Sequence, residues 1–127
     1  MKADILADTS VWIEYFNKAE SKTGARLENM LIENKVLGAG IILTELLQGA
    51  KIKKEFDAIL NNYTALPLLE ANINTWIMSG KISFDLRRKG ITIPTTDLII
   101  GSLALESNSK IFTLDPHFSK IPGVVLL

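Results

Sequence analysis

The stretch ILADTS, residues 5–10, contains the pattern on which the fold prediction depends. Its first three residues form a short apolar run of the kind that makes a buried strand. Asp8, Thr9 and Ser10 follow at once, where such a strand would end and a short helix over residues 11–16 would begin. The stretch therefore predicts a strand that leads directly into a helix, with an acidic side chain at the junction.

The same alternation of apolar runs and helical patterns continues along the chain. Strands are expected at residues 5–7, 36–40, 65–68, 110–114 and 123–127. Helices are expected at residues 11–16, 24–34, 41–49, 51–63, 70–89 and 97–106. Thr23 is the expected cap of the second helix, Pro67 weakens the third strand, and an apolar stripe from Ile73 to Phe84 marks the fifth helix. Because strands separated by helices form parallel sheets covered on both faces, the predicted fold class is α/β.

The composition restricts the function before any motif is considered. The chain has 127 residues, 47% of them hydrophobic, with 14 basic and 14 acidic residues, no cysteine and one histidine. It is expected to form one domain, residues 1–127, and the lack of cysteine excludes disulfides, thiol catalysis and zinc–thiolate sites. No apolar run approaches the roughly 18–20 residues of a membrane span, and Asp4 and Asp8 interrupt any signal sequence. We therefore expect a cytoplasmic protein that does not enter a membrane.

Four acidic residues fall where a sheet of this kind binds its ligands, outside the carboxyl ends of the strands. They are Asp8, Glu45, Asp97 and Asp115. Three of them also have a structural explanation, since Asp8 can cap a helix, Asp97 suits a helix N-terminus and Asp115 suits a turn. Glu45 stands among leucines and is harder to explain in this way. The edge that the four residues share favours a functional cluster.

Such a cluster requires a counter-charge. Two carboxylates about 4 Å apart repel each other by roughly 4 kcal/mol at an effective dielectric constant of about 20. Three or four of them must therefore take up protons or hold a cation. Oxygen ligands without cysteine favour Mg²⁺ or Mn²⁺, and water bound to such an ion is suited to hydrolysis of a phosphodiester.

Other chemistries fit the sequence poorly. The patterns of a P-loop NTPase and of a serine hydrolase, G-x-x-x-x-G-K-[ST] and G-x-S-x-G, are both missing. His117 lies two residues after Asp115, where it can contact phosphate or orient a carboxylate, although a single loop histidine more often has no such role. The basic clusters at residues 51–54 and 87–89 are usual for solvated helix surfaces, but beside a nuclease site they can hold a polyanion backbone.

Four short motifs together resemble a known family. They are DTSVWI at residues 8–13, TELLQG at 44–49, TDLIIG at 96–101 and TLDPHF at 113–118. In this order and at this spacing they resemble the motifs of PIN-domain proteins, and most of all those of the VapC-type toxins of bacterial and archaeal toxin–antitoxin pairs. The resemblance covers essentially the whole chain. One departure is Gly101-Ser102, where the family often has two alanines.

The resemblance implies a three-layer α/β/α sandwich with a mostly parallel sheet of about five strands. It implies an endoribonuclease that depends on Mg²⁺ or Mn²⁺. The family's catalytic and metal-binding acidic residues correspond to Asp8, Glu45, Asp97 and Asp115. Its supporting hydroxyl groups correspond to Ser10 or Thr9, and to Thr113.

The resemblance also implies partners. These are an RNA substrate, a cognate antitoxin whose C-terminal segment fills the active-site groove, and a second copy of the chain. We expect the homodimer to form partly through Leu46, Ile52 and Phe56. The alternative function is a PIN-like module that binds RNA or protein without cutting, although such a scaffold need not bear the repulsion of four acidic residues. A flap-type DNA nuclease fits less well, because the short chain lacks a helical arch.

Overall fold

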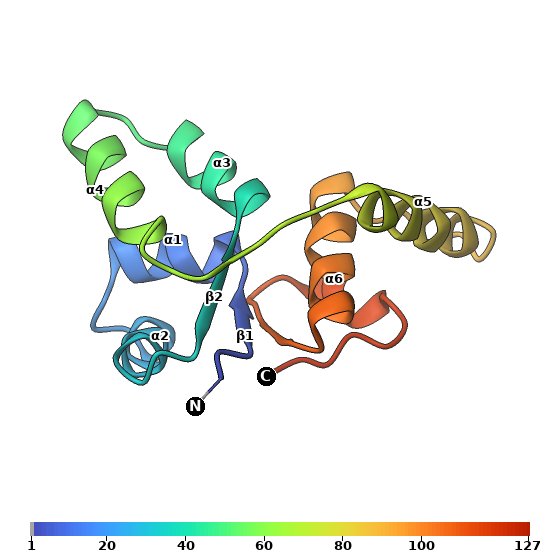
Figure 1. The fold of residues 1–127 in the computed structure, drawn as a ribbon, viewed down its shortest axis with the longest axis horizontal. Helices are drawn as coiled ribbons and strands as arrows, with labels where there is room; N and C mark the ends of the chain where they lie inside the picture. Colours follow the sequence, from blue (N-terminus) through green and yellow to red (C-terminus); the bar gives the residue numbers. More distant parts are fainter. Residues whose placement is uncertain (1) are drawn as a thin grey trace.

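The computed structural model describes residues 2–127, and in this part of the chain short strands alternate with helices (Figure 1). The strands are β1 (Ile5–Ala7), β2 (Val36–Ala39), β3 (Leu68–Leu69) and β4 (Lys110–Phe112). The helices are α1 (Thr9–Asn17), α2 (Lys22–Ile32), α3 (Gly40–Gln48), α4 (Lys53–Tyr63), α5 (Ile73–Arg87), α6 (Thr95–Ser107) and the 3₁₀ helix η1 (Pro116–Lys120). None of the helices described is long and apolar enough to cross a membrane.

The strands form a parallel sheet of four strands in the order β3-β2-β1-β4. The expectation of about five strands is therefore wrong by one. Residues 123–127 contribute only an isolated bridge between Ile111 and Leu126, instead of a strand. The segment after Gly123, where φ is 85°, bonds to β4 only through Ile111, whose N–H donates to the Val125 carbonyl and whose carbonyl accepts the Leu127 N–H, both at 2.9 Å. The predicted α/β class with a parallel sheet is confirmed.

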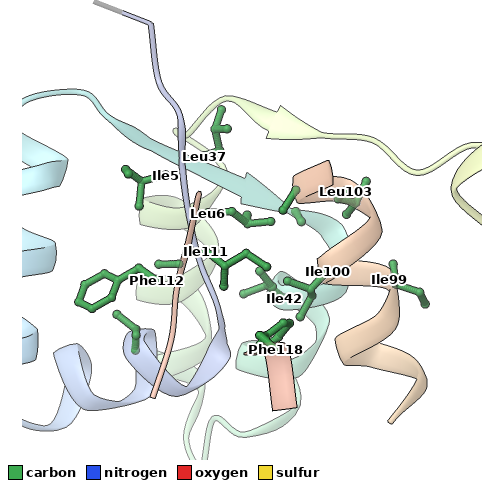
Figure 2. Close-up of a cluster of buried hydrophobic side chains, with 14 of the residues drawn as sticks. Ile5, Leu6, Leu37, Ile42, Ile99, Ile100, Leu103, Ile111, Phe112 and Phe118 are labelled. Atoms are coloured by element: carbon green, nitrogen blue, oxygen red, sulfur yellow. The ribbon is translucent and has the colours of Figure 1, made fainter. Parts of the chain in front are cut away.

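Helices cover both faces of the sheet, so its central strands are buried. Helices α1 to α4 lie on one side of β1 and β2, and α5 and α6 lie on the other (Figure 1). Leu6 of β1 and Ile111 of β4 are both 0% exposed and meet Ile42 of α3 and Ile100 of α6 in the core (Figure 2). Strands with both faces covered explain the short, continuously apolar runs in the sequence.

Two helices begin at other residues than predicted, because the capping residue determines where each helix starts. The cap of α2 is Ser21 instead of Thr23, because Ser21 has an extended backbone and its Oγ accepts the Gly24 N–H at 3.0 Å. The long helix predicted from residue 70 begins at Ile73, where Asn72 and Thr75 form a reciprocal capping box. Capping depends on the backbone angle at one residue, and a composition pattern does not define that angle.

Helix α5 turns its apolar stripe outward. Ile73, Trp76, Ile77 and Phe84 are between 50% and 67% exposed. The opposite side of the helix packs on α6 with small polar residues, and the Oγ atoms of Ser79 and Ser102 lie 2.8 Å apart. Leu46, expected at a dimer surface, is instead 4% exposed and belongs to the core. The apolar surface of α5 is therefore available to a partner.

Tyr63 connects α4 to the sheet, and its hydroxyl gives a test of the packing. The buried Tyr63 oxygen accepts the N–H of Ala39 at 2.9 Å, at the end of β2. We expect Tyr63→Phe to lower the free energy of unfolding by about 1–3 kcal/mol, because the Ala39 amide loses its acceptor. Tyr15→Phe is the matched control, since the Tyr15 hydroxyl bonds to Glu28 at the surface. Urea unfolding of both variants measures the difference, and equal losses would contradict the assignment.

Candidate active site

The site begins where two neighbouring strands end. The last residues of β1 and β4, Ala7 and Phe112, are paired in register. The N–H of Asp8 donates to the Phe112 carbonyl at 3.0 Å. Asp8 and Thr113 therefore leave the sheet side by side, and Thr113 Oγ1 donates to Asp8 Oδ2 at 2.7 Å. Parallel pairing brings together two residues that are 105 positions apart in the sequence.

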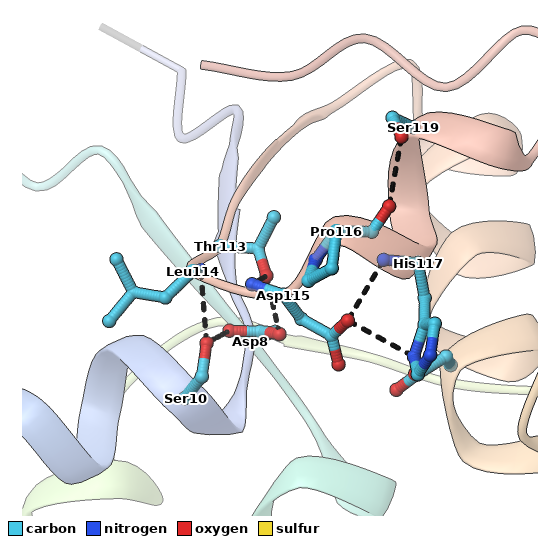
Figure 3. A network of polar contacts seen from close by, with 9 residues as sticks. Asp8, Ser10, Thr113, Leu114, Asp115, Pro116, His117 and Ser119 are labelled. Carbon is cyan, nitrogen blue, oxygen red and sulfur yellow. Dashed lines mark hydrogen bonds and ion pairs between the residues drawn. The ribbon is translucent and has the colours of Figure 1, made fainter.

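Both carboxylate oxygens of Asp8 accept a hydroxyl proton whose direction is fixed (Figure 3). Ser10 Oγ donates to Asp8 Oδ1 at 2.6 Å and itself accepts the Leu114 N–H at 3.1 Å. Thr113 Oγ1 likewise accepts the Asp115 N–H at 2.8 Å. A hydroxyl has one proton, so each of these groups has to direct its proton toward Asp8. The arrangement holds Asp8 in one orientation as an acceptor.

Asp8 is buried as well as held. Its residue exposure is 4%, and its side chain also accepts the Val11 N–H as the cap of α1. Burial raises the pKa of Asp8, the hydrogen bonds from Ser10 and Thr113 lower it, and the charge of Asp115 raises it further. The negative charge of Asp8 therefore works against folding unless a cation is present.

Among the described residues, Asp97, Asp115 and His117 form a group of side chains that could hold a metal ion. One ligand atom from each lies within 4.8 Å of the others. His117 Nδ1 is 3.0 Å from Asp97 Oδ2 and 3.0 Å from Asp115 Oδ1. Asp97 comes from the first turn of α6, and Asp115 caps η1. Burial raises the pKa of Asp97, a hydrogen bond from His117 lowers it, and the charges of Asp115 and Asp8 raise it.

Glu45 joins the site through a different hydroxyl. It lies on α3, and its Oε1 accepts a proton from Thr9 Oγ1 at 2.6 Å. The two hydroxyl residues after Asp8 thus have separate partners, Ser10 with Asp8 and Thr9 with Glu45. Glu45 also lines a groove of about 270 Å³ between α1, α3 and α4, together with Ile13 and Phe16.

The structure brings Asp8, Asp97 and Asp115 into one electrostatic cluster, as the edge rule predicted. It holds Glu45 by a hydrogen bond to Thr9, the neighbour of Asp8 in the chain. Of the two interpretations of His117, a loop histidine without a role was favoured over one that orients a carboxylate, and the structure places its ring in contact with Asp97 and Asp115. The signal in the sequence was the two-residue spacing between Asp115 and His117. A 3₁₀ turn that begins after Asp115 brings the ring back over the carboxylates.

The donor set fits a divalent cation. Carboxylate oxygens dominate, one imidazole nitrogen accompanies them, and the chain has no cysteine. Burial and the charges of neighbouring carboxylates raise the pKa of Asp8 and of Asp97. A cation bound nearby would lower both pKa values again. Asp97, Asp115 and His117 each present a possible ligand atom within 4.8 Å of the others, and Asp8 adds a carboxylate to the same electrostatic cluster.

Comparison with known proteins gives consistent results. The model of the PIN domain family matches residues 5–124. Ribonuclease VapC2 from Rickettsia felis is 25% identical over 126 residues, which cover 95% of this chain and 94% of that protein. The structure of VapBC2 from Rickettsia felis, bound to a DNA fragment from its promoter, matches with a TM-score of 0.82 and 24% identity over 100% of this chain and 98% of that one. DNA-bound VapBC from Salmonella typhimurium matches with a TM-score of 0.79 and 23% identity, over 98% and 97% of the two chains.

The raised pKa of Asp97 predicts how stability depends on pH without metal. A carboxylate whose pKa is higher in the folded state stabilises the fold fully below its unfolded pKa, and this contribution is lost as the pH rises through the folded pKa. We therefore expect Asp97→Asn to gain stability relative to the parent as the pH rises. Urea unfolding in EDTA from about pH 4 to about pH 7 measures this difference.

Asp57→Asn is the control for this experiment, because Asp57 is an exposed partner of Lys53 on α4. Its stability relative to the parent should show no comparable gain over the same pH range. A constant or shrinking difference between Asp97→Asn and the parent would contradict the burial of a charged Asp97.

Proposed function

The chain belongs to the PIN domain family, and from this premise we propose that it is an endoribonuclease that acts as the toxin of a toxin–antitoxin pair. The observation that carries the proposal is the convergence of Asp8, Asp97 and Asp115 at one edge of the sheet, with both oxygens of Asp8 held by hydroxyl protons. Residues 1–127 act as a single nuclease domain in this proposal. We propose that it acts on RNA in the cytoplasm.

We propose Mg²⁺ or Mn²⁺ as the cofactor, held by Asp8, Glu45, Asp97 and Asp115. The bound ion supplies a water of lowered pKa and neutralises charge that develops on the phosphodiester. The protein groups keep the ligands in place. Ser10 and Thr113 fix Asp8, and Thr9 fixes Glu45.

The reaction needs a group that accepts the proton of the attacking water. We propose that one carboxylate of the site takes this proton, since a carboxylate within hydrogen-bond reach of the water can act as a general base. The water oxygen would bond to phosphorus as the bond from phosphorus to the leaving ribose oxygen breaks, and that oxygen would take up a proton from solvent. No covalent bond would form between enzyme and substrate. Lys51 lines the same groove as Glu45 and can contact the RNA backbone there.

The groove beside Glu45 also suits the proposed antitoxin. Ile13, Phe16 and Ile59 give it an apolar wall, and Glu45 and Lys51 provide charges of both signs. A segment of the antitoxin that lies in this groove would reach the carboxylate cluster and exclude RNA. The antitoxin partner therefore occupies the side of the molecule formed by α1, α3 and α4.

We propose that a second copy of the chain packs on α5. Its outward face carries Ile73, Trp76, Ile77 and Phe84, and Gly80 lies on the same stripe. A Cβ added at Gly80 would meet nothing within 4 Å, so nothing inside the chain requires this glycine. Glycine within a helix is about 1 kcal/mol less favourable than alanine, and close approach of another helix is a physical reason to keep it.

A PIN-like module that binds without cutting is the alternative, and RNA cleavage discriminates between the two. We expect the parent to cleave RNA in Mn²⁺ and not in EDTA. Asp97→Asn should lower the rate by at least about 100-fold, because one ligand charge is lost while the fold is kept. Asp57→Asn on the surface of α4 is the control and should cleave at the parental rate. Cleavage by Asp97→Asn at the parental rate would remove Asp97 from the catalytic group.

The dimer has its own test. We expect Ile77→Asp to convert the protein from dimer to monomer in sedimentation at micromolar concentration, because it places a charge in the α5 stripe. Ile32→Asp on α2 is the matched control, since the two isoleucines are 62% and 69% exposed. A monomeric parent, or equal behaviour of the two variants, would contradict the assignment of α5.

A further inference from the structure

We propose that His117 is a ligand of the bound ion and makes the site favour first-row transition ions such as Mn²⁺ over Mg²⁺. The inference rests on the proposed function, because it concerns the ion of the same site. It adds a nitrogen donor to a set of carboxylates and assigns to that donor the choice between ions.

The position of the imidazole nitrogen carries the proposal. His117 Nδ1 lies 3.0 Å from an oxygen of Asp97 and 3.0 Å from an oxygen of Asp115. Two ligands at right angles on an octahedral ion lie about 3.0 Å apart when each is about 2.1 Å from the ion. The nitrogen therefore already lies at the spacing of a neighbouring ligand from each of the two oxygens, and all three atoms lie within 4.8 Å of one another.

The backbone around His117 is fixed, so the ring position is built into the fold. Asp115 Oδ1 accepts the His117 N–H at 2.8 Å, and Pro116 occupies the first turn of η1. Ser119 Oγ donates to the Pro116 carbonyl at 2.8 Å, and Phe118 is 0% exposed in the core. These contacts hold the turn from both ends, so His117 has little freedom to move away from the carboxylates.

The ring can present a lone pair at Nδ1. Its side chain is 39% exposed, so the second nitrogen, Nε2, can keep its proton in contact with water. A neutral imidazole with its proton on Nε2 has a free lone pair at Nδ1. That lone pair points into the group formed with Asp97 and Asp115, as Figure 3 shows for the ring and Asp115.

The donor type then determines which ion is preferred. Mg²⁺ prefers oxygen ligands and retains its water, whereas imidazole is a good ligand for first-row transition ions, and their affinities rise from Mn²⁺ to Co²⁺. An aspartate at the position of His117 would add charge without this discrimination. A histidine adds affinity for Mn²⁺ and Co²⁺ and little affinity for Mg²⁺.

A hydrogen bond from Nδ1–H to the carboxylates would have the same 3.0 Å distances, so spectroscopy has to separate the two roles. We expect pulsed EPR of the full chain with Mn²⁺ to show coupling to a ligating ¹⁴N, and His117→Ala to abolish it. His117 provides the imidazole unambiguously, because the chain has one histidine. Bound Mn²⁺ without nitrogen coupling would overturn the proposal.

Metal affinities provide the second measurement. His117→Ala should weaken the binding of Co²⁺ most and that of Mn²⁺ next, by roughly tenfold or more. The binding of Mg²⁺ should be weakened least. His117→Asn keeps an N–H donor near the carboxylates but offers no nitrogen ligand, so its affinity for Mn²⁺ relative to Mg²⁺ should fall as well. An Asn variant with the parental ratio would show that the hydrogen bond is what matters, and would overturn the ligand role. A parent that binds none of these ions would contradict the proposed function itself.

Discussion

Two hydroxyl protons, from Ser10 and Thr113, hold the carboxylate of Asp8, and the rest of the site is arranged around this contact. The contact exists because β1 and β4 are parallel neighbours with their last residues in register. Side chains alternate along a strand, so a slip by one residue would direct Thr113 away from Asp8. The fully buried residues Leu6 and Ile111, which oppose such a slip, are therefore as necessary to the site as the carboxylates.

The same contact holds the negative charge of Asp8 in a buried position, where burial disfavours the charged form. Burial raises the pKa of Asp8 and of Asp97, and the charge of Asp115 raises both further. Without metal, the charged site lowers the free energy of unfolding. The packing of the sheet and its helices has to offset this loss. Sites that trade stability for chemistry are common, and here the physical reason is explicit, since negative groups converge where the chain removes water.

The sequence predicted the features that depend on the order of elements. Asp8 and Asp115 follow strands, and the carboxyl ends of parallel strands meet at one edge, so their convergence needed no knowledge of side-chain angles. The hydrogen bond between Thr9 and Glu45 and the contact of the His117 ring with Asp97 depend on individual turns and rotamers. Composition patterns do not define these. The expected fifth strand depended on the same kind of detail, because the segment after Gly123 meets β4 only in the bridge between Ile111 and Leu126.

Helix α5 shows most clearly what periodicity can establish. A stripe of apolar residues indicates that a helix has two faces, but it does not indicate which face the rest of the chain covers. Here the covered face is polar and satisfied, because Ser79 and Ser102 meet across α5 and α6, and Ser102 also donates to the Leu98 carbonyl at 2.8 Å. Hydroxyl groups that need particular partners fix the register of two helices more sharply than apolar packing, which tolerates sliding. Ser79 of α5 also reaches the Leu98 carbonyl, at 3.4 Å, so the polar contacts that leave the apolar stripe of α5 exposed lie next to the turn of α6 that carries Asp97.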